Sequence, residues 1–179
     1  VVKDKGVTNL TNMVGHNFRL GEIECAMGIE QLKKLKGLVQ SRQLLAERLT
    51  DGLKSLDGLK TPTQFNNRTH VYYIYAMQLD LEVLQVSRQK IVEALAAEGV
   101  IVSSSYQNIH LIPMYQQKIA FGSKGFPWSS EFCKREISYK KGICPNAEYL
   151  NDNSYMGFGM CVYDLTLEDI KLIIKSFHK

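Results

Sequence analysis

The stretch MVGHNFRLGEIECAMGIEQLKKL, residues 13–35, joins a polar turn to the first part of a long apolar stripe. Apolar residues recur at helical spacing over residues 20–56, which predicts one long helix there. Gly37 weakens its middle by about 1 kcal/mol relative to alanine, which makes it a place for a kink or break. Gly58 is expected to stop the helix, because glycine readily adopts the left-handed conformation. A helix this long is typical of a connection between two domains.

Length and composition indicate a globular protein. The chain has 179 residues, of which 45% are hydrophobic and 22% are charged, as in ordinary soluble domains. No apolar run approaches the roughly 20 residues that a membrane-spanning helix needs, and the polar first residues do not resemble a signal peptide. Because the sequence begins with Val1, we expect a fragment or the ordered part of a longer protein.

Charge and cysteine usage narrow the function classes. The net charge is +4, and a solvated helix face and a loop account for the lysine clusters at 33–36 and 140–141. Nucleic-acid binding is not expected, since it needs a denser basic face or a reader motif. The four cysteines form no C-x-x-C pair and the four histidines are scattered, so no metal site is predicted. Reduced thiols and a cytoplasmic location are expected.

Downstream of the long helix, the patterns predict a small mixed domain. Alternating apolar residues indicate strands, helical spacing after a serine or threonine cap indicates helices, and aromatics mixed with turn formers indicate a structured loop. The predicted elements are strand 69–79, a helix from Ser87 to Gly99, strand 100–102, loop 103–128, a short helix 129–138, strand 156–162 and a last helix capped at Thr166. This order predicts an α+β fold with a small, mainly antiparallel sheet and helices on one face.

Residue spacing yields no complete catalytic constellation: the chain has no glycine-rich phosphate loop, no G-x-S-x-G and no H-E-x-x-H. Two polar groups remain. In the first, the amide of Asn17, helical N–H groups and the guanidinium of Arg19 suit an anion such as phosphate. The alternative is a turn-forming Asn17 and a surface Arg19. The second group is Tyr106, His110 and Tyr115, where the histidine serves either a binding site or the structure alone.

Three segments together resemble the DegT/DnrJ/EryC1/StrS aminotransferases, pyridoxal-phosphate (PLP) enzymes that mostly aminate keto sugars attached to nucleotides. VGHNFRLGEIECAMGIEQLKKL is similar to the family segment G-(Y/H)-N-(F/W/Y)-R-(M/L) and the helix after it. YQNIHLIPMYQ resembles the family's loop of tyrosine, histidine, proline and tyrosine, and YKKGICPNAEYL resembles G-x-(C/F)-P-x-A-E. One departure is YMGFGMCVYDLT, where many members have an LCLP-like strand, and it indicates a subgroup.

The resemblance implies the C-terminal part of a fold type I enzyme. Residues 1–58 would form a linker segment and the long interdomain helix, and residues 59–179 would form the C-terminal small domain. The N-terminal domain, which carries the Schiff-base lysine in this family, would lie outside the chain. The 179 residues alone are therefore expected to hold no catalytic residue and to be inactive.

The resemblance also implies an active site shared within a homodimer, with PLP as the cofactor. Asn17 and Arg19 match cofactor-binding residues of the family. The asparagine reaches the cofactor phosphate from across the dimer interface, and the arginine would help hold the anionic substrate or order the phosphate region. Tyr106 and His110 match the loop that approaches the nucleotide-sugar substrate. The implied reaction moves an amino group, commonly from glutamate, to a keto sugar for surface-polysaccharide or amino-sugar biosynthesis. The alternative is a free-standing, non-catalytic interaction or regulatory module that reuses this small domain.

Overall fold

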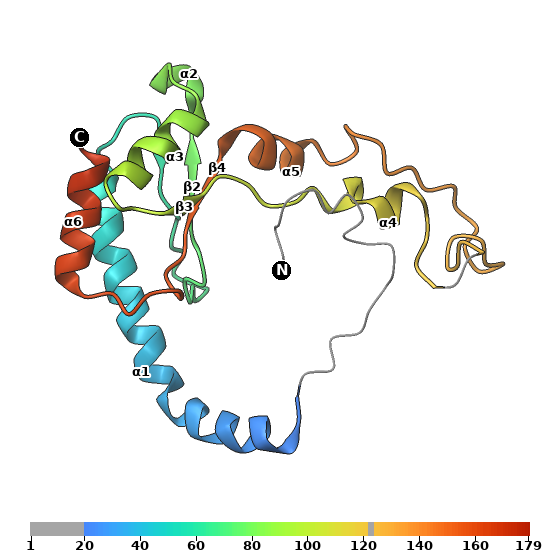
Figure 1. Ribbon diagram of the computed structural model, residues 1–179, viewed down its shortest axis with the longest axis horizontal. Helices are drawn as coiled ribbons and strands as arrows, with labels where there is room; N and C mark the ends of the chain where they lie inside the picture. The colour runs from blue at the N-terminus through green and yellow to red at the C-terminus, as the bar shows by residue number, and fades with distance from the viewer. Residues whose placement is uncertain (1–19, 122–123) are drawn as a thin grey trace. The chain divides into compact units, whose positions relative to one another are not determined.

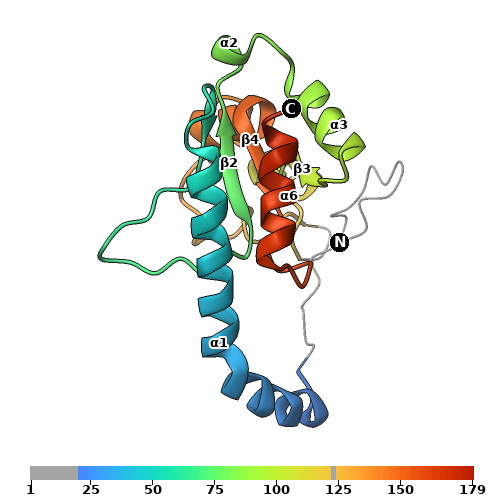
Figure 2. The same cartoon turned by 90° about the vertical axis from the view of Figure 1, so that its left-hand side faces the viewer.

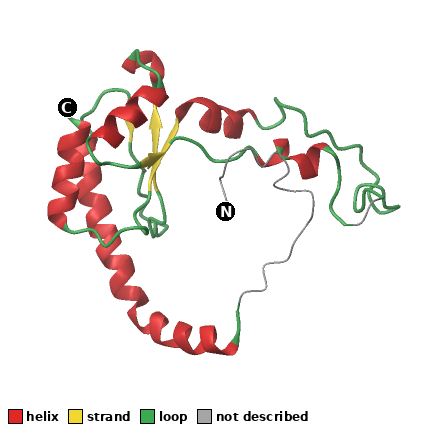
Figure 3. Ribbon diagram, viewed as in Figure 1, coloured by secondary structure: helices red, strands yellow, loops and turns green. Residues whose placement is uncertain are grey.

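The computed structural model describes residues 20–121 and 124–179 (Figure 1). Helices and loops dominate it, and the strands are short (Figure 3). The chain divides into two compact units. The sheet unit consists of Leu20–Tyr106 with Leu150–Lys179, and the described part of the loop unit is residues 107–121 and 124–149. The predicted domain boundary at residue 58 stays a prediction.

The long predicted helix is confirmed. Helix α1 runs from Glu22 to Leu53 and continues through Gly37, although Figure 1 shows it bent along its length. It ends where the N–H of Lys54 donates to the carbonyl of Thr50. Gly58 has a φ of +77° in the turn that follows, so this glycine shapes the exit from the helix after the last helical residue.

Only the C-terminal half of α1 is buried. Its buried residues are Leu45, Ala46, Leu49 and Leu53. Apolar side chains of the preceding turns, such as Ile23 and Leu32, are exposed. Among the described helices, none combines the length and the apolar character that crossing a bilayer requires.

Four short strands form one antiparallel sheet in the order β1-β2-β4-β3. The strands are β1 (Leu59–Lys60), β2 (Tyr75–Leu79), β3 (Val102–Ser103) and β4 (Tyr155–Phe158). In β2, Tyr75, Met77 and Leu79 are buried while Ala76 and Gln78 are exposed, so alternate side chains face the core. The predicted α+β fold with a small antiparallel sheet is confirmed.

The last predicted helix is also confirmed. Helix α6 (Leu167–Phe177) begins with a capping box, in which the Thr166 hydroxyl accepts from the N–H of Asp169 at 3.2 Å and the Asp169 carboxylate accepts from the N–H of Thr166 at 2.8 Å. Ile170 and Ile173 are buried in the same hydrophobic cluster as β2. Figures 1 and 2 show α1 and α6 side by side on one side of the sheet.

The predicted strand 69–79 is wrong in its first half, because β2 begins only at Tyr75. Tyr72 has a φ of +51°, a left-handed conformation that interrupts an extended chain. Its N–H donates to Nδ1 of His70 at 2.9 Å, which closes a local turn. Tyr72 is nevertheless buried, so its place in the apolar alternation reflects burial in the core and not strand pairing.

Helix α3 (Arg88–Ala97) follows the predicted Ser87 cap, after the short helix α2 (Leu81–Leu84). The guanidinium of Arg88 connects α3 to the π-helical turn η2 (Leu150–Ser154) and to the start of β4. It donates hydrogen bonds to the main-chain carbonyls of Leu150 at 3.4 Å, Asn151 at 3.0 Å, Asp152 at 3.0 Å and Tyr155 at 3.2 Å. One side chain therefore satisfies several carbonyls of an irregular turn.

In its described residues, the loop unit contains only short helical turns. They are η1 (Ile109–Leu111), α4 (Pro113–Gln116) and α5 (Pro145–Tyr149). The predicted helix 129–138 is wrong, since this segment forms separate turns, such as the bond from the N–H of Cys133 to the carbonyl of Ser130. Phe132 is 85% exposed, so the segment buries no apolar face that would stabilise a helix.

Candidate functional site

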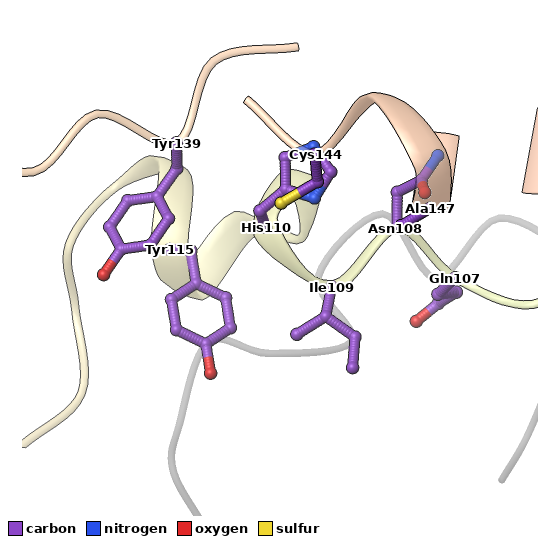
Figure 4. Close-up of a pocket in the computed structure, with 8 residues that line it drawn as sticks. All are labelled: Gln107, Asn108, Ile109, His110, Tyr115, Tyr139, Cys144 and Ala147. Atoms are coloured by element: carbon purple, nitrogen blue, oxygen red, sulfur yellow. The ribbon is translucent and has the colours of Figure 1, made fainter. Parts of the chain in front are cut away.

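The loop unit holds an open pocket of about 440 Å³. Figure 4 labels its eight lining residues. They come from the chain around η1, from α4, from the segment at Tyr139 and from the start of α5. All of them lie within residues 107–149, so the described lining of the pocket comes from this unit.

The side chain of Gln116 holds two walls of the pocket together. Its Nε2 donates to the carbonyl of His110 at 2.7 Å and to the carbonyl of Tyr139 at 2.6 Å. Helix α4 is short, but Pro113 at its first turn presets the helical φ and favours its start. The turn that carries His110 is therefore fixed relative to Tyr139.

A histidine and a glutamate form a buried pair beside the pocket. Nε2 of His110 lies 2.8 Å from Oε1 of Glu148. The exposed fractions of the two residues are 8% and 6%. Such burial is uncommon for a glutamate and requires that its charge be compensated by nearby donors.

Main-chain N–H groups complete the surroundings of the Glu148 carboxylate. The N–H of Gly142 lies 2.8 Å from both carboxylate oxygens, and the N–H of Cys144 lies 3.3 Å from Oε1. Burial by itself would raise the pKa of Glu148, but these N–H groups and His110 outweigh it and hold the pKa below its ordinary value. Glu148 is therefore an ionised carboxylate at neutral pH.

An aromatic cluster borders the same pocket. The ring centroids of Tyr115 and Tyr139 are 5.1 Å apart, and Trp128 meets each of these rings edge-on at 6.2 Å. Nε1 of Trp128 donates to the hydroxyl of Tyr139 at 2.9 Å. Figure 4 shows the rings of Tyr115 and Tyr139 next to each other at one end of the pocket. The pocket thus combines apolar ring faces with a few polar groups, as ligand pockets commonly do.

Of the four predicted site residues, the structure describes two. Asn17 and Arg19 lie outside the described residues, so their roles stay predictions. His110 lines the pocket and is buried. Tyr106 belongs to the sheet unit, where its side chain is 62% exposed and its N–H donates to Oδ1 of Asn151 at 2.9 Å. Substrate binding by Tyr106 and His110 stays a prediction as well.

Two residues that build the pocket, Glu148 and Gln116, were not predicted from the sequence. Glu148 ends the CPNAE part of a segment that carries the family resemblance, which was a usable signal. The signal did not say what Glu148 contacts, because His110 lies 38 residues away along the chain. Gln116 follows Tyr115 in the loop and carries no distinguishing local pattern.

The described pocket does not fit the phosphate of PLP. Among its described lining residues there is no lysine or arginine to pair with that anion. The described part of the chain also brings no three histidine, cysteine, aspartate or glutamate side chains together as a metal site.

The pattern of the DegT/DnrJ/EryC1/StrS aminotransferase family matches residues 2–143. The chain belongs to that family. The match covers most of the chain and includes both the long helix and the segment that carries His110. The resemblance predicted from three sequence segments is thereby confirmed.

One curated relative is the UDP-4-amino-4,6-dideoxy-N-acetyl-beta-L-altrosamine transaminase of Helicobacter pylori. It is 30% identical over 128 residues, which cover 70% of this chain and 32% of that protein. This chain spans 32% of the length of each of the first three curated relatives.

Solved structures share the fold. The aminotransferase TlmJ of Streptoalloteichus hindustanus superposes with a TM-score of 0.59 at 24% identity, covering 86% of this chain and 34% of TlmJ. The E. coli GDP-4-keto-6-deoxy-D-mannose-3-dehydratase, solved with bound hydrated PLP, superposes with a TM-score of 0.60 at 22% identity, covering 91% and 36%. The observed fold is thus that of a part of larger aminotransferase-like proteins.

Proposed function

We propose that this chain forms the C-terminal part of a PLP-dependent aminotransferase that moves an amino group, from glutamate, to a nucleotide-linked keto sugar. The observation that carries the proposal is the family match over residues 2–143. The name of the H. pylori relative, a UDP-amino-sugar transaminase, supports a sugar nucleotide as the substrate class. The product would serve surface-polysaccharide or amino-sugar biosynthesis.

The pocket of the loop unit supplies the substrate contacts in this proposal. The ring faces of Tyr115 and Tyr139 offer an apolar surface for a sugar ring, and His110 offers a polar atom for a sugar hydroxyl. Because no lysine or arginine is among the described lining residues, the diphosphate of the nucleotide would bind outside this pocket. Tyr106, exposed in the sheet unit, is proposed as a further substrate contact.

Asn17 and Arg19 are proposed to act at the phosphate of the cofactor. Their assignment rests on the NFR motif just before α1 and on the family membership. An amide and a guanidinium are suitable donors to phosphate oxygens. The proposed assembly is a homodimer, in which Asn17 reaches the cofactor bound by the partner subunit.

When bound, PLP supplies the electron sink for moving the amino group. The lysine that holds it is proposed to lie outside these 179 residues, because no lysine in this sequence matches the family's Schiff-base lysine motif. The residues of this chain bind and orient the ligands. The chain by itself is therefore expected to be inactive.

The proposal is tested with the intact protein that contains this chain. With PLP and glutamate it should convert a nucleotide-linked keto sugar to the amine, detected by mass spectrometry, while the isolated 179 residues should not. Failure of the intact protein to aminate any such sugar would instead favour a non-catalytic interaction module.

A substitution tests the phosphate contact. Asn17→Ala in the intact protein should weaken PLP binding about tenfold, the effect of one hydrogen bond to a charged group. Asn12→Ala, in the same segment but outside the matched motif, is the control and should bind PLP normally. Equal PLP affinity in both variants would remove Asn17 from the phosphate site.

A further inference from the structure

We infer that Glu148 is a positioning residue that holds His110 with a proton on Nε2, so that Nδ1 of His110 accepts a hydrogen bond from a hydroxyl group of the sugar. The identity of the ligand rests on the proposed function. The orientation of the imidazole rests on the contacts of His110 and Glu148 alone.

The first step concerns the proton between the two side chains. The carboxylate oxygens of Glu148 accept hydrogen bonds from the main-chain N–H groups of Gly142 and Cys144. Because an N–H group can only donate, both oxygens act as acceptors here. An ionised carboxylate has no proton to give, so the hydrogen of the 2.8 Å contact belongs to Nε2 of His110. Neutral His110 therefore carries its proton on Nε2 and a lone pair on Nδ1.

The second step concerns access to Nδ1. In the described part of the chain no hydrogen bond engages Nδ1 of His110, and no fully buried side-chain nitrogen or oxygen lacks a partner. Nδ1 is therefore at least slightly accessible to solvent, and His110 is one of the residues that line the pocket. The atom available to a ligand is then a hydrogen-bond acceptor.

The third step concerns rigidity. Gly142 has a φ of +101°, a conformation that favours glycine. In this conformation the N–H of Gly142 donates to both carboxylate oxygens of Glu148. The carbonyl of His110 is held separately by Gln116. Both the ring and the main chain of His110 are thus fixed before a ligand arrives, which lowers the entropy cost of binding.

The predicted ligand group is a hydroxyl donor. A carbonyl or phosphate oxygen has no proton to offer an acceptor nitrogen, whereas a sugar hydroxyl donates readily. The neighbouring rings of Tyr115 and Tyr139 add an apolar surface, so the combination favours a hydroxyl-bearing ring over a charged group.

The tautomer is tested directly by NMR. Long-range proton–nitrogen spectra of the intact protein with 15N-labelled histidine, assigned with His110→Gln, should show the Nε2–H form of His110. A proton on Nδ1 in the unsubstituted protein, with or without a proton on Nε2, would overturn the inference.

Substitutions then test the role of Glu148. Glu148→Leu should populate the Nδ1–H form, and Glu148→Gln, which keeps one acceptor oxygen, should restore much of the Nε2–H form. The exposed Glu136→Gln is the control and should change nothing. An unchanged His110 tautomer in folded Glu148→Leu would overturn the positioning role, whether or not the protein proves to be an aminotransferase.

Kinetics test the contact with the sugar. In the active intact protein, Glu148→Leu should raise KM for the keto sugar about tenfold, the effect of one lost hydrogen bond, and leave KM for glutamate unchanged. Rescue of the sugar KM by Glu148→Gln supports positioning. Equal KM values in all variants, with the tautomer changed as expected, would overturn the hydroxyl contact.

Discussion

Gly52 of α1 lies directly against Ile174 of α6, so closely that a Cβ atom at Gly52 would overlap the isoleucine side chain. The overlap involves both branches of Ile174, which is stiff at its Cβ and cannot simply turn away. The two helices form part of one hydrophobic core, and Nε2 of His178 also contacts the carbonyl of Gly52 at 2.8 Å. The absence of a side chain at Gly52 sets how closely α1 and α6 pack.

Overpacking in Gly52→Ala should cost the sheet unit about 1–3 kcal/mol of unfolding free energy, as is usual in a core. The gain in helix propensity, about 1 kcal/mol, offsets part of this cost, so we predict a net loss of up to about 2 kcal/mol. Chemical denaturation followed by circular dichroism measures the difference.

Gly37→Ala is the matched control. No atom lies within 4 Å of a Cβ built there, so the same substitution in the same helix should be neutral or stabilising by up to about 1 kcal/mol. If both variants changed stability equally, the close approach at Gly52 would have no energetic role.

The four carbonyl contacts of Arg88 give a second prediction. Arg88→Ala leaves the carbonyls of η2 without this donor and should cost about 2–3 kcal/mol of unfolding free energy. Arg88→Lys should recover only part of it, because an ammonium lacks the planar fork of donors. Denaturation of both variants beside the exposed Lys90→Ala measures this; equal stability of all three would contradict it.

The hydroxyl of Tyr75 lies 2.7 Å from Oγ1 of Thr50 in the core. Burial raises the pKa of Tyr75 to about 12, against the opposing effect of that hydrogen bond. Since the folded pKa exceeds the unfolded value of 10.0, the neutral phenol's stabilising contribution is complete below pH 10.0 and is lost between there and about pH 12.

Tyr75→Phe should remove the loss of unfolding free energy that the ionisation of Tyr75 causes between pH 10.0 and about pH 12. It should also leave the tyrosinate absorbance that develops up to pH 11 almost unchanged, because native Tyr75 remains protonated there. A substantial decrease in this absorbance would show that Tyr75 ionises normally.

How far the sequence predicted the fold depends on the range of the interactions involved. Helices α1 and α6 follow from their local apolar period and, in α6, from a capping box four residues wide, so both were predicted. The turn at Tyr72 was not, because its alternation of apolar residues resembles a strand while its backbone conformation follows a bond to His70. The segment 129–138 lacked a helical apolar period, and no core holds it as a helix.

The same distinction applies to the site. His110 was predicted because it lies in a family-like loop, and the structure places it in the pocket. The contact with Glu148 joins residues that are distant in sequence, and Gln116 acts through two main-chain carbonyls. Neither relationship has a signature in spacing or composition.

Acid sensitivity of the loop unit is the final prediction. The pKa of Glu148 is held below its ordinary value of 4.5, so its contribution to stability is fully present above that pH and is lost as the pH falls through the lower, folded value. The single tryptophan, Trp128, lies in this unit beside Tyr139 and reports on it by fluorescence. We expect its acid transition below pH 4.5 to depend on Glu148.

In Glu148→Gln the transition of Trp128 should lose much of its pH dependence, because this side chain no longer binds a proton on unfolding. Glu136→Gln, exposed in the same unit, should retain it. Hydrogen bonds from Lys54 and Thr166 also lower the pKa values of Asp51 and Asp169, but both belong to the sheet unit. Circular dichroism dominated by that unit should therefore keep its acid transition in Glu148→Gln, and an unaltered Trp128 transition would show that another group controls the loop unit.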